Sequence, residues 1–185
     1  DGGEIIIPDN HTLTLVQSSR FIVYKGGTIK GNDIELTNAS GGSYNYNAGT
    51  MEIDDFHVNQ EGAFYNCGTV RVDEMDFDSG CKFINQGKAY IGKTNSSITI
   101  DNGCYLYVEE FVGTLNMGDT SSAEIEDFEG HSNKYNTRIT MGDNSMITVL
   151  DEAELSQAQF MGPNNEYALV KINKIEDIGN FSSQG

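Results

Sequence analysis

Apolar and polar residues alternate along most of the chain in short runs that are interrupted by glycine. The pattern recurs in nearly the same form as YNYNAGTMEIDDFHV (44–58), AFYNCGTVRVDEMDF (63–77) and KFINQGKAYIG (82–92). The glycines that anchor the repeats, at positions 27, 49, 68, 87 and 113, are 22, 19, 19 and 26 residues apart. Alternation with a period of two predicts strands, and a repeat of about 20 residues predicts stacked structural units. We therefore expect an all-β repeat protein.

A repeat of this length that contains only strands corresponds to one turn of a parallel β-solenoid, or β-helix. Its backbone groups can pair only with the turns above and below, so repetition is what allows each thin turn to fold. We predict a right-handed solenoid of about nine turns with three short strands per turn. Residues 1–150 are assigned to the β-helix. Residues 151–185, where the alternation weakens, are assigned to an irregular C-terminal cap or last turns of the same domain and the start of a linker.

The apolar positions of the repeats predict which side chains share the core. Asparagines 47, 66 and 85 recur at one position, where stacked amides can hydrogen-bond along the solenoid. The expected inward columns are Phe64, Phe83 and Leu106 in the first strand, Met51, Val70, Ala89 and Leu115 in the second, and Phe56, Met75 and Ile98 in the third.

Charge narrows the range of partners. The chain has 28 acidic and 11 basic residues, a net charge of −17. Nucleic-acid binding is disfavoured because it depends on Lys and Arg, and binding to anionic membranes is disfavoured for the same reason. No apolar run reaches the roughly 20 residues of a membrane-spanning helix. The opening DGGEIII contains neither a signal peptide nor an initiator Met, so we expect a mature or excised domain.

Several segments resemble a known group of proteins. The units FYNCGTVRV and FINQGKAYI, the segment IIIPDNHTLTL, and the later RITMGDNSMITVL and FMGPNNEYALVKINKI are similar to the β-helical region of bacterial cell-surface or exported proteins of gut anaerobes, which often carry a LruC domain. The resemblance implies export, an extracellular or cell-surface location, and neighbouring domains in a longer chain. It carries over no catalytic residue.

Acidic residues recur on the outer face of the expected third strand. Asp55 and Glu74 share a position with Asp33, and Asp76 occupies the next outward position. Stacked carboxylates repel one another unless a cation such as Ca²⁺ offsets their charge, or unless water and salt screen them. The candidate calcium ligands are Asp55, Glu74, Asp76, Asp78 and Asp101, and no other cofactor is indicated. The alternative is a solvated acidic face without a bound ion.

The same carboxylates raise the alternative of a polysaccharide-active enzyme, either a lyase or a glycoside hydrolase. Glycosidases use two carboxyl groups in different environments. A repeated column argues against this, because catalysis requires residues that differ from their neighbours. We therefore expect a protein that is not an enzyme.

A row of tyrosines is the best candidate binding surface. Exposed aromatic rings on successive rungs could stack against the faces of sugar rings, or contact a host or bacterial surface protein. The alternative is that the rings only stabilise the sheet through cross-strand packing. The tyrosines expected in one stripe on the first strand are Tyr44, Tyr46, Tyr65, Tyr105 and Tyr107.

Cys81 and Cys104 each follow a glycine and are expected at the same position of the turn, where they could be bonded or simply packed together. In sum, the sequence predicts a non-catalytic surface module. It would act as an adhesin-like or glycan-contacting surface, or as a rigid spacer that presents a neighbouring domain.

Overall fold

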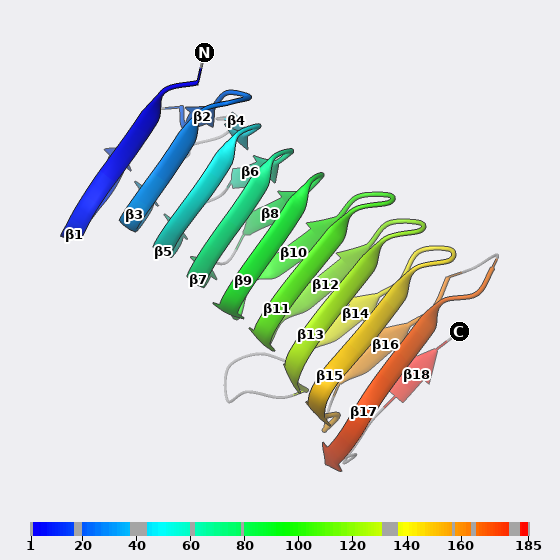
Figure 1. The fold of residues 1–185 in the computed structure, drawn as a ribbon. Coiled ribbons are helices and arrows are strands. Elements are labelled where there is room, and N and C mark those ends of the chain that lie inside the picture. The colour runs from blue at the N-terminus through cyan, green and yellow to red at the C-terminus, as the bar shows by residue number, and fades with distance from the viewer. Residues whose placement is uncertain are drawn as a thin grey trace.

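The chain folds into two parallel β-sheets that lie against each other. The computed structural model describes residues 2–16, 20–37, 44–59, 62–78, 80–130, 137–156, 158–163, 166–177 and 182–184. Odd-numbered strands form sheet A and even-numbered strands form sheet B, each with nine strands (Figure 1). The chain alternates between the sheets and advances one strand at a time, which makes a right-handed parallel β-solenoid, as predicted. Among the described residues no helix is long and apolar enough to cross a membrane.

The strands of sheet A are long and those of sheet B are short. Sheet A contains β1 (Glu4–Val16), β3 (Thr28–Thr37), β5 (Thr50–Asn59), β7 (Thr69–Phe77), β9 (Lys88–Thr94), β11 (Tyr105–Phe111), β13 (Ser122–Glu129), β15 (Met146–Glu154) and β17 (Leu169–Asp177). Sheet B contains β2 (Ile22–Val23), β4 (Tyr44–Asn47), β6 (Gly62–Asn66), β8 (Cys81–Asn85), β10 (Ser97–Ile100), β12 (Thr114–Met117), β14 (Arg138–Thr140), β16 (Gln159–Met161) and β18 (Ser182–Gln184).

Each turn therefore has two strands, and the prediction of three is wrong. In β5 the side chains of Met51 and Ile53 point inward, those of Asp54 and Asp55 are both exposed, and inward packing resumes at Phe56. The alternation thus changes phase while β5 remains one strand that pairs with β7. This change of phase in the sequence resembles the end of one strand and the start of another.

The solenoid continues into residues 151–185, the segment for which the sequence predicts a cap or the last irregular turns. Strands β16, β17 and β18 extend both sheets beyond residue 154, although the pairing of β15 with β17 shifts register twice. This segment therefore adds rungs to the solenoid. The solenoid has about seven turns, slightly fewer than the nine predicted.

The core and the asparagine ladder are confirmed for the central turns. The rings of Phe64 and Phe83 stack with centroids 6.0 Å apart and planes 8° apart, and both side chains are fully buried. Asn47 donates from Nδ2 to Asn66 Oδ1 at 2.8 Å, and Asn66 does the same to Asn85 at 2.8 Å. These contacts join residues 19 apart in sequence, so the central repeats lie directly over one another.

Beyond residue 94 the predicted register is wrong. Ile98 pairs with Phe83 and Leu115 pairs with Ile98, so both lie in sheet B. Leu106, expected beside Phe83, instead pairs with Ala89 in sheet A. The rung shortens here: Lys93 and Glu110, which pair across β9 and β11, are 17 residues apart instead of 19.

The expected stacking of Cys81 on Cys104 is also wrong. Cys81 is buried at the start of β8 in sheet B, where it pairs with Gly62. Cys104 lies directly before β11 in sheet A, and its backbone N–H donates to Asp101 O at 3.1 Å. None of the three cysteines forms a disulfide within the described part of the chain, and the thiol of Cys81 donates to Val58 O at 3.4 Å.

Candidate functional site

The predicted tyrosine stripe is divided between the two sheets. Tyr46 pairs with Tyr65 in sheet B, whereas Tyr107 pairs with Tyr90 in sheet A, and Tyr105 lies beside Tyr107 on the same strand. The prediction of a single stripe is therefore wrong, because it relied on the register that fails after residue 94. The side chain of Tyr44 lies outside the described residues.

The tyrosines of sheet A are held by neighbouring side chains. Tyr105 donates from Oη to Glu124 Oε2 at 2.9 Å, and burial together with this bond raises the pKa of Tyr105 to about 12. Tyr107 donates to Glu126, and this hydrogen bond raises the pKa of Tyr107. Both hydroxyls thus bind carboxylates of the protein itself, which favours a structural role.

The outward column that contains the Lys30–Glu52 ion pair, at 3.3 Å, continues through Arg71 and Tyr90 to Tyr107. Arg71 lies above the ring of Tyr90, with 4.0 Å from its Cζ to the ring centroid. Contacts of this kind between adjacent strands help to fix the register.

The tyrosines of sheet B line an open groove at the N-terminal end of the solenoid. This tyrosine groove has a volume of about 490 Å³, and its lining residues are Arg20, Ile22, Tyr24, Tyr46 and Tyr65. Tyr24 is 74% exposed, and Tyr46 and Tyr65 are half-buried. Ile22, Tyr46 and Tyr65 face outward at one position of β2, β4 and β6, so three successive rungs build the groove floor.

Sequence reasoning missed Arg20, Ile22 and Tyr24 as members of this site. The available signal was the alternating segment RFIVY, which comes shortly before the glycine anchor at position 27. The spacing differs from the next repeat, because Val23 lies four residues before Gly27 whereas its partner Asn47 lies two residues before Gly49. Counting back from the glycine would therefore have given the wrong register for this rung.

Polar groups at the rim of the groove differ in their partners. The hydroxyl of Tyr46 interacts with Cys67, and this hydrogen bond raises the pKa of Tyr46. Arg20 is exposed and forms no ion pair with any carboxylate of the described residues. The groove thus combines aromatic faces with an available guanidinium group.

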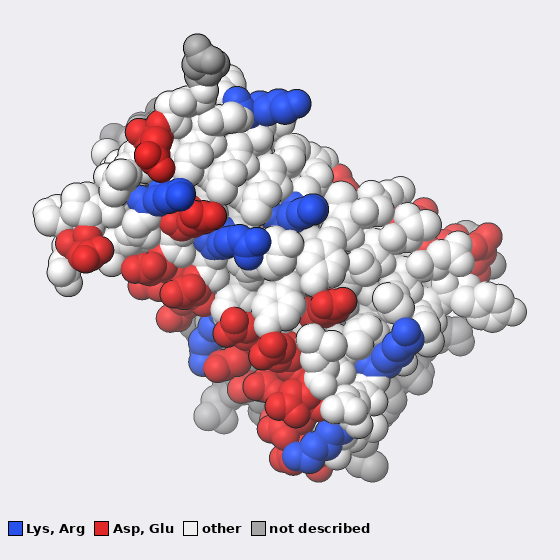
Figure 2. Space-filling model, viewed as in Figure 1, with Lys and Arg blue, Asp and Glu red and all other residues white. Residues whose placement is uncertain are grey.

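The acidic columns lie on sheet A, where Figure 2 shows red side chains gathered along one edge. Asp55 pairs with Glu74 and His57 with Asp76, as the repeat alignment predicts. Burial, together with Asp33 and Glu74, raises the pKa of Asp55. Lys93 continues the column after Glu74 and binds Glu110 with 2.6 Å between Nζ and Oε2.

The remaining candidate calcium ligands do not share one position. Asp78 follows β7, and its Oδ1 is 4.0 Å from Nε2 of His57. Asp101 lies in the turn after β10 and accepts a hydrogen bond from Gln86 at 2.6 Å. Within the described ranges, no three His, Cys, Asp or Glu side chains are arranged to hold a metal ion.

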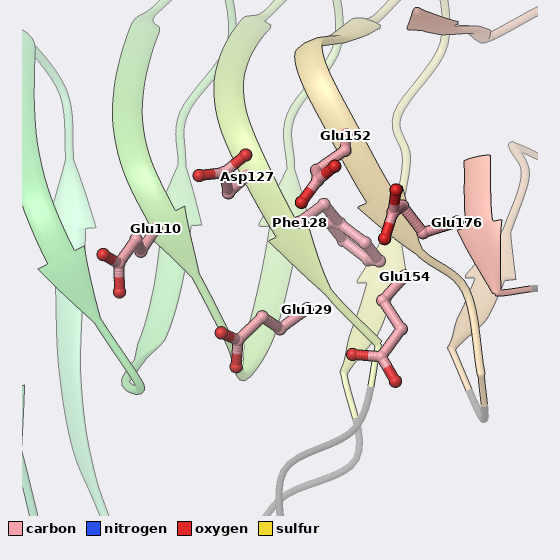
Figure 3. Close-up of a pocket in the computed structure, with 7 residues that line it drawn as sticks. All are labelled: Glu110, Asp127, Phe128, Glu129, Glu152, Glu154 and Glu176. Atoms are coloured by element: carbon pink, nitrogen blue, oxygen red, sulfur yellow. The ribbon is translucent and has the colours of Figure 1, made fainter. Parts of the chain in front are cut away.

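A second hollow, which we call the acidic hollow, lies near the C-terminal end of sheet A and was not predicted. Its volume is about 440 Å³, and Figure 3 shows carboxylates from four neighbouring strands around it. Burial and the nearby Asp151 and Glu152 raise the pKa of Asp127. Lys174 offsets part of the charge by binding Glu152 at 2.9 Å and also Glu176. The lining residues are Glu110, Asp127, Phe128, Glu129, Glu152, Glu154 and Glu176.

Comparisons with protein-family models, curated proteins and solved structures find no match to this chain. The expected relation to cell-surface proteins of gut anaerobes, with the export that it implies, stays a prediction.

Proposed function

We propose that the protein is a non-catalytic module that contacts an extended glycan through the tyrosine groove of sheet B. The observation that carries the proposal is the tyrosine groove itself, where Tyr24, Tyr46 and Tyr65 surround one open volume with Arg20 at its side. The module would act as an adhesin-like surface on a rigid solenoid.

The chemistry of the groove suits a sugar chain. Tyrosine rings offer a flat apolar face for the C–H groups of a sugar ring, and the guanidinium group of Arg20 offers hydrogen-bond donors for its polar edge. Strand spacing of about 4.8 Å places Tyr46 and Tyr65 on adjacent rungs. The groove is open and shallow, so it fits a chain that continues along the surface better than a small enclosed ligand.

A second candidate function is hydrolysis or cleavage of a polysaccharide at the acidic hollow. The raised pKa of Asp127, beside several other carboxylates, is the observation that favours it. General acid catalysis needs one carboxyl group that stays protonated near an ionised one. Released reducing or unsaturated ends, lost on Asp127→Asn, would replace the binding proposal with this one.

The binding proposal is tested by measuring affinity for a panel of plant and bacterial polysaccharides. Tyr46→Ala combined with Tyr65→Ala should lower the affinity at least about tenfold, which corresponds to about 1.4 kcal/mol, because the two substitutions remove both aromatic faces from the groove floor. Tyr167→Ala is the matched control, since Tyr167 is 89% exposed and belongs to the other end of the solenoid. Unchanged affinity in the double variant, or no binding to any member of the panel, contradicts the proposal.

A further inference from the structure

Charge is divided between the two sheets of the solenoid. Not one of the strands that the structure describes in sheet B contains Asp or Glu, although the chain has 28 acidic residues. Every acidic residue in a strand that the structure describes lies in sheet A, and Figure 2 shows part of this surplus. The outer face of sheet B is thus a surface without strand carboxylates on a protein of net charge −17.

The charged residues on this face are cations at one position of the rungs. Lys82 pairs with Ala63, which pairs with Tyr44, and Arg20 occupies the corresponding position beside β2. In the other direction the register of β8 with β10 leads from Lys82 to Ser97, then through Thr114 to Arg138. The cationic column on sheet B therefore consists of Arg20, Lys82 and Arg138.

These three cations are evenly spaced and available. Three strand intervals separate Arg20 from Lys82 and Lys82 from Arg138, which corresponds to about 14 Å at about 4.8 Å per interval. All three side chains are exposed, and none forms an ion pair with a carboxylate of the described residues. Arg138 donates from Nη2 to Met161 Sδ at 2.9 Å, which leaves its other guanidinium N–H groups for a ligand.

Screening decides whether the acidic sheet A would prevent an anion from binding here. The Debye length is about 8 Å at physiological ionic strength, and packed sheets are separated by about 10 Å. Repulsion from the opposite outer face is therefore strongly reduced, whereas a direct contact with Arg20, Lys82 or Arg138 is screened much less.

We propose that the ligand of sheet B is an anionic polysaccharide that runs along the solenoid axis, with its sugar rings on the tyrosine groove and its acidic groups at the cationic column. This inference rests on the proposed glycan-binding function and names the chemical class of the ligand. Both carboxylate and sulfate groups fit, because guanidinium and ammonium groups bind either anion through charge-assisted hydrogen bonds.

The test uses two matched ligand pairs at 0.15 M salt. Polygalacturonate is compared with its fully methyl-esterified form, and dextran sulfate with dextran. We expect at least one acidic member to bind about tenfold or more tightly than its neutral counterpart, and the pair that shows this distinguishes carboxylate from sulfate recognition. Equal affinity for acidic and neutral members overturns the inference.

The matched variants neutralise the same number of cations on different faces. The triple variant Arg20→Gln, Lys82→Gln and Arg138→Gln should lower affinity for the acidic ligand about tenfold and leave neutral ligands unaffected. The control Lys30→Gln, Lys88→Gln and Lys171→Gln changes cations of sheet A and should leave the affinity within about twofold. An equal loss in both triple variants overturns the inference, because it would reflect net charge alone.

The outcomes separate this inference from the proposed function. Suppose that Tyr46→Ala with Tyr65→Ala abolishes binding, that the charge variants bind as tightly as the native protein, and that neutral ligands bind as tightly as acidic ones. The glycan-binding function then stands and the anionic ligand is wrong. If no polysaccharide binds, both are wrong. Equal binding of polyglutamate and polygalacturonate would overturn recognition of a sugar chain.

Discussion

Asn66 donates a hydrogen bond from Nδ2 to Oδ1 of Asn85 on the next turn at 2.8 Å, and both side chains are fully buried. The same Nδ2 also donates to Lys88 O at 2.9 Å, while Asn66 Oδ1 accepts from Asn47 at 2.8 Å. The amide is thus fully bonded inside the turn. The ladder ends after Asn85, because the next residue at this position of sheet B is Ile100.

Replacing the central amide of the ladder should destabilise the protein strongly. Asn66→Leu removes the partners of several buried groups, each of which costs about 1–3 kcal/mol when left unbonded. We expect the free energy of unfolding in urea to fall by at least about 2 kcal/mol. Asn116→Leu is the matched control, since Asn116 faces outward on β12 and is only half-buried. Similar losses for both variants would contradict a specific role of the ladder.

The acidic columns predict a stability that depends on pH. The folded protein raises the pKa of Asp55 through burial and through Asp33 and Glu74. A carboxyl group whose pKa is raised by folding binds its proton more tightly in the folded state. Its contribution to stability is therefore fully present below the pKa of the unfolded state, about 3.9. This contribution is lost as the pH rises through the pKa of the folded state. Asp55→Asn should therefore raise Tm at pH 7, with a benefit that shrinks toward pH 4.

The control for this prediction is Glu4→Gln, which removes one exposed negative charge at the start of β1. It should change Tm much less than Asp55→Asn across the same pH range. Thermal unfolding between pH 4 and pH 8 measures both variants. A benefit of Asp55→Asn that is independent of pH, or that grows as pH falls, would show that the carboxylate is not destabilised in the fold.

Lys93 should stabilise sheet A in a manner that depends on salt. Its Nζ is 2.6 Å from Glu110 Oε2, and this hydrogen bond raises the pKa of Lys93. Lys93→Gln leaves Glu74 and Glu110 on either side of an uncharged residue, so we expect Tm to fall by a few degrees at 0.05 M salt. An isolated exposed pair contributes about 0–1 kcal/mol, and added salt should reduce the loss. Lys25→Gln, in the turn before β3, is the control, and an equal loss there would argue against a local effect.

The sequence predicts the fold class and the central repeats well for a physical reason. Residues such as Phe64 and Phe83 recur at a constant interval, face a core that admits only apolar groups, and stack on each other. A slip of one residue would turn these side chains to solvent, so the repeat defines the register strongly. The paired acidic positions of Asp55 and Glu74 were predicted for the same reason.

The later register could not be predicted because its markers are ambiguous. Gly113-Thr114 has the same residues as Gly68-Thr69, but Thr114 begins a strand of sheet B and Thr69 a strand of sheet A. Gly113 has a φ of +126°, a conformation that suits glycine at a turn into either sheet. After β9 the rung shortens, and the local alternation of apolar and polar residues is compatible with a strand in either sheet. The sequence therefore assigns Tyr105 and Tyr107 to the wrong sheet.

Disulfide trapping tests the central claim, that sheet B presents its own outer face separate from that of sheet A. The structure pairs Ile84 with Thr99, whereas the repeat alignment alone would pair Ile84 with Tyr107. The native cysteines are first removed by Cys67→Ser, Cys81→Ala and Cys104→Ser, so that only introduced cysteines can form a bond. Adjacent strands bring Cα atoms within the 4.4–6.8 Å range that a disulfide needs. We predict that Ile84→Cys with Thr99→Cys forms a bond under mild oxidation and that Ile84→Cys with Tyr107→Cys does not. The opposite result would contradict the division into two faces.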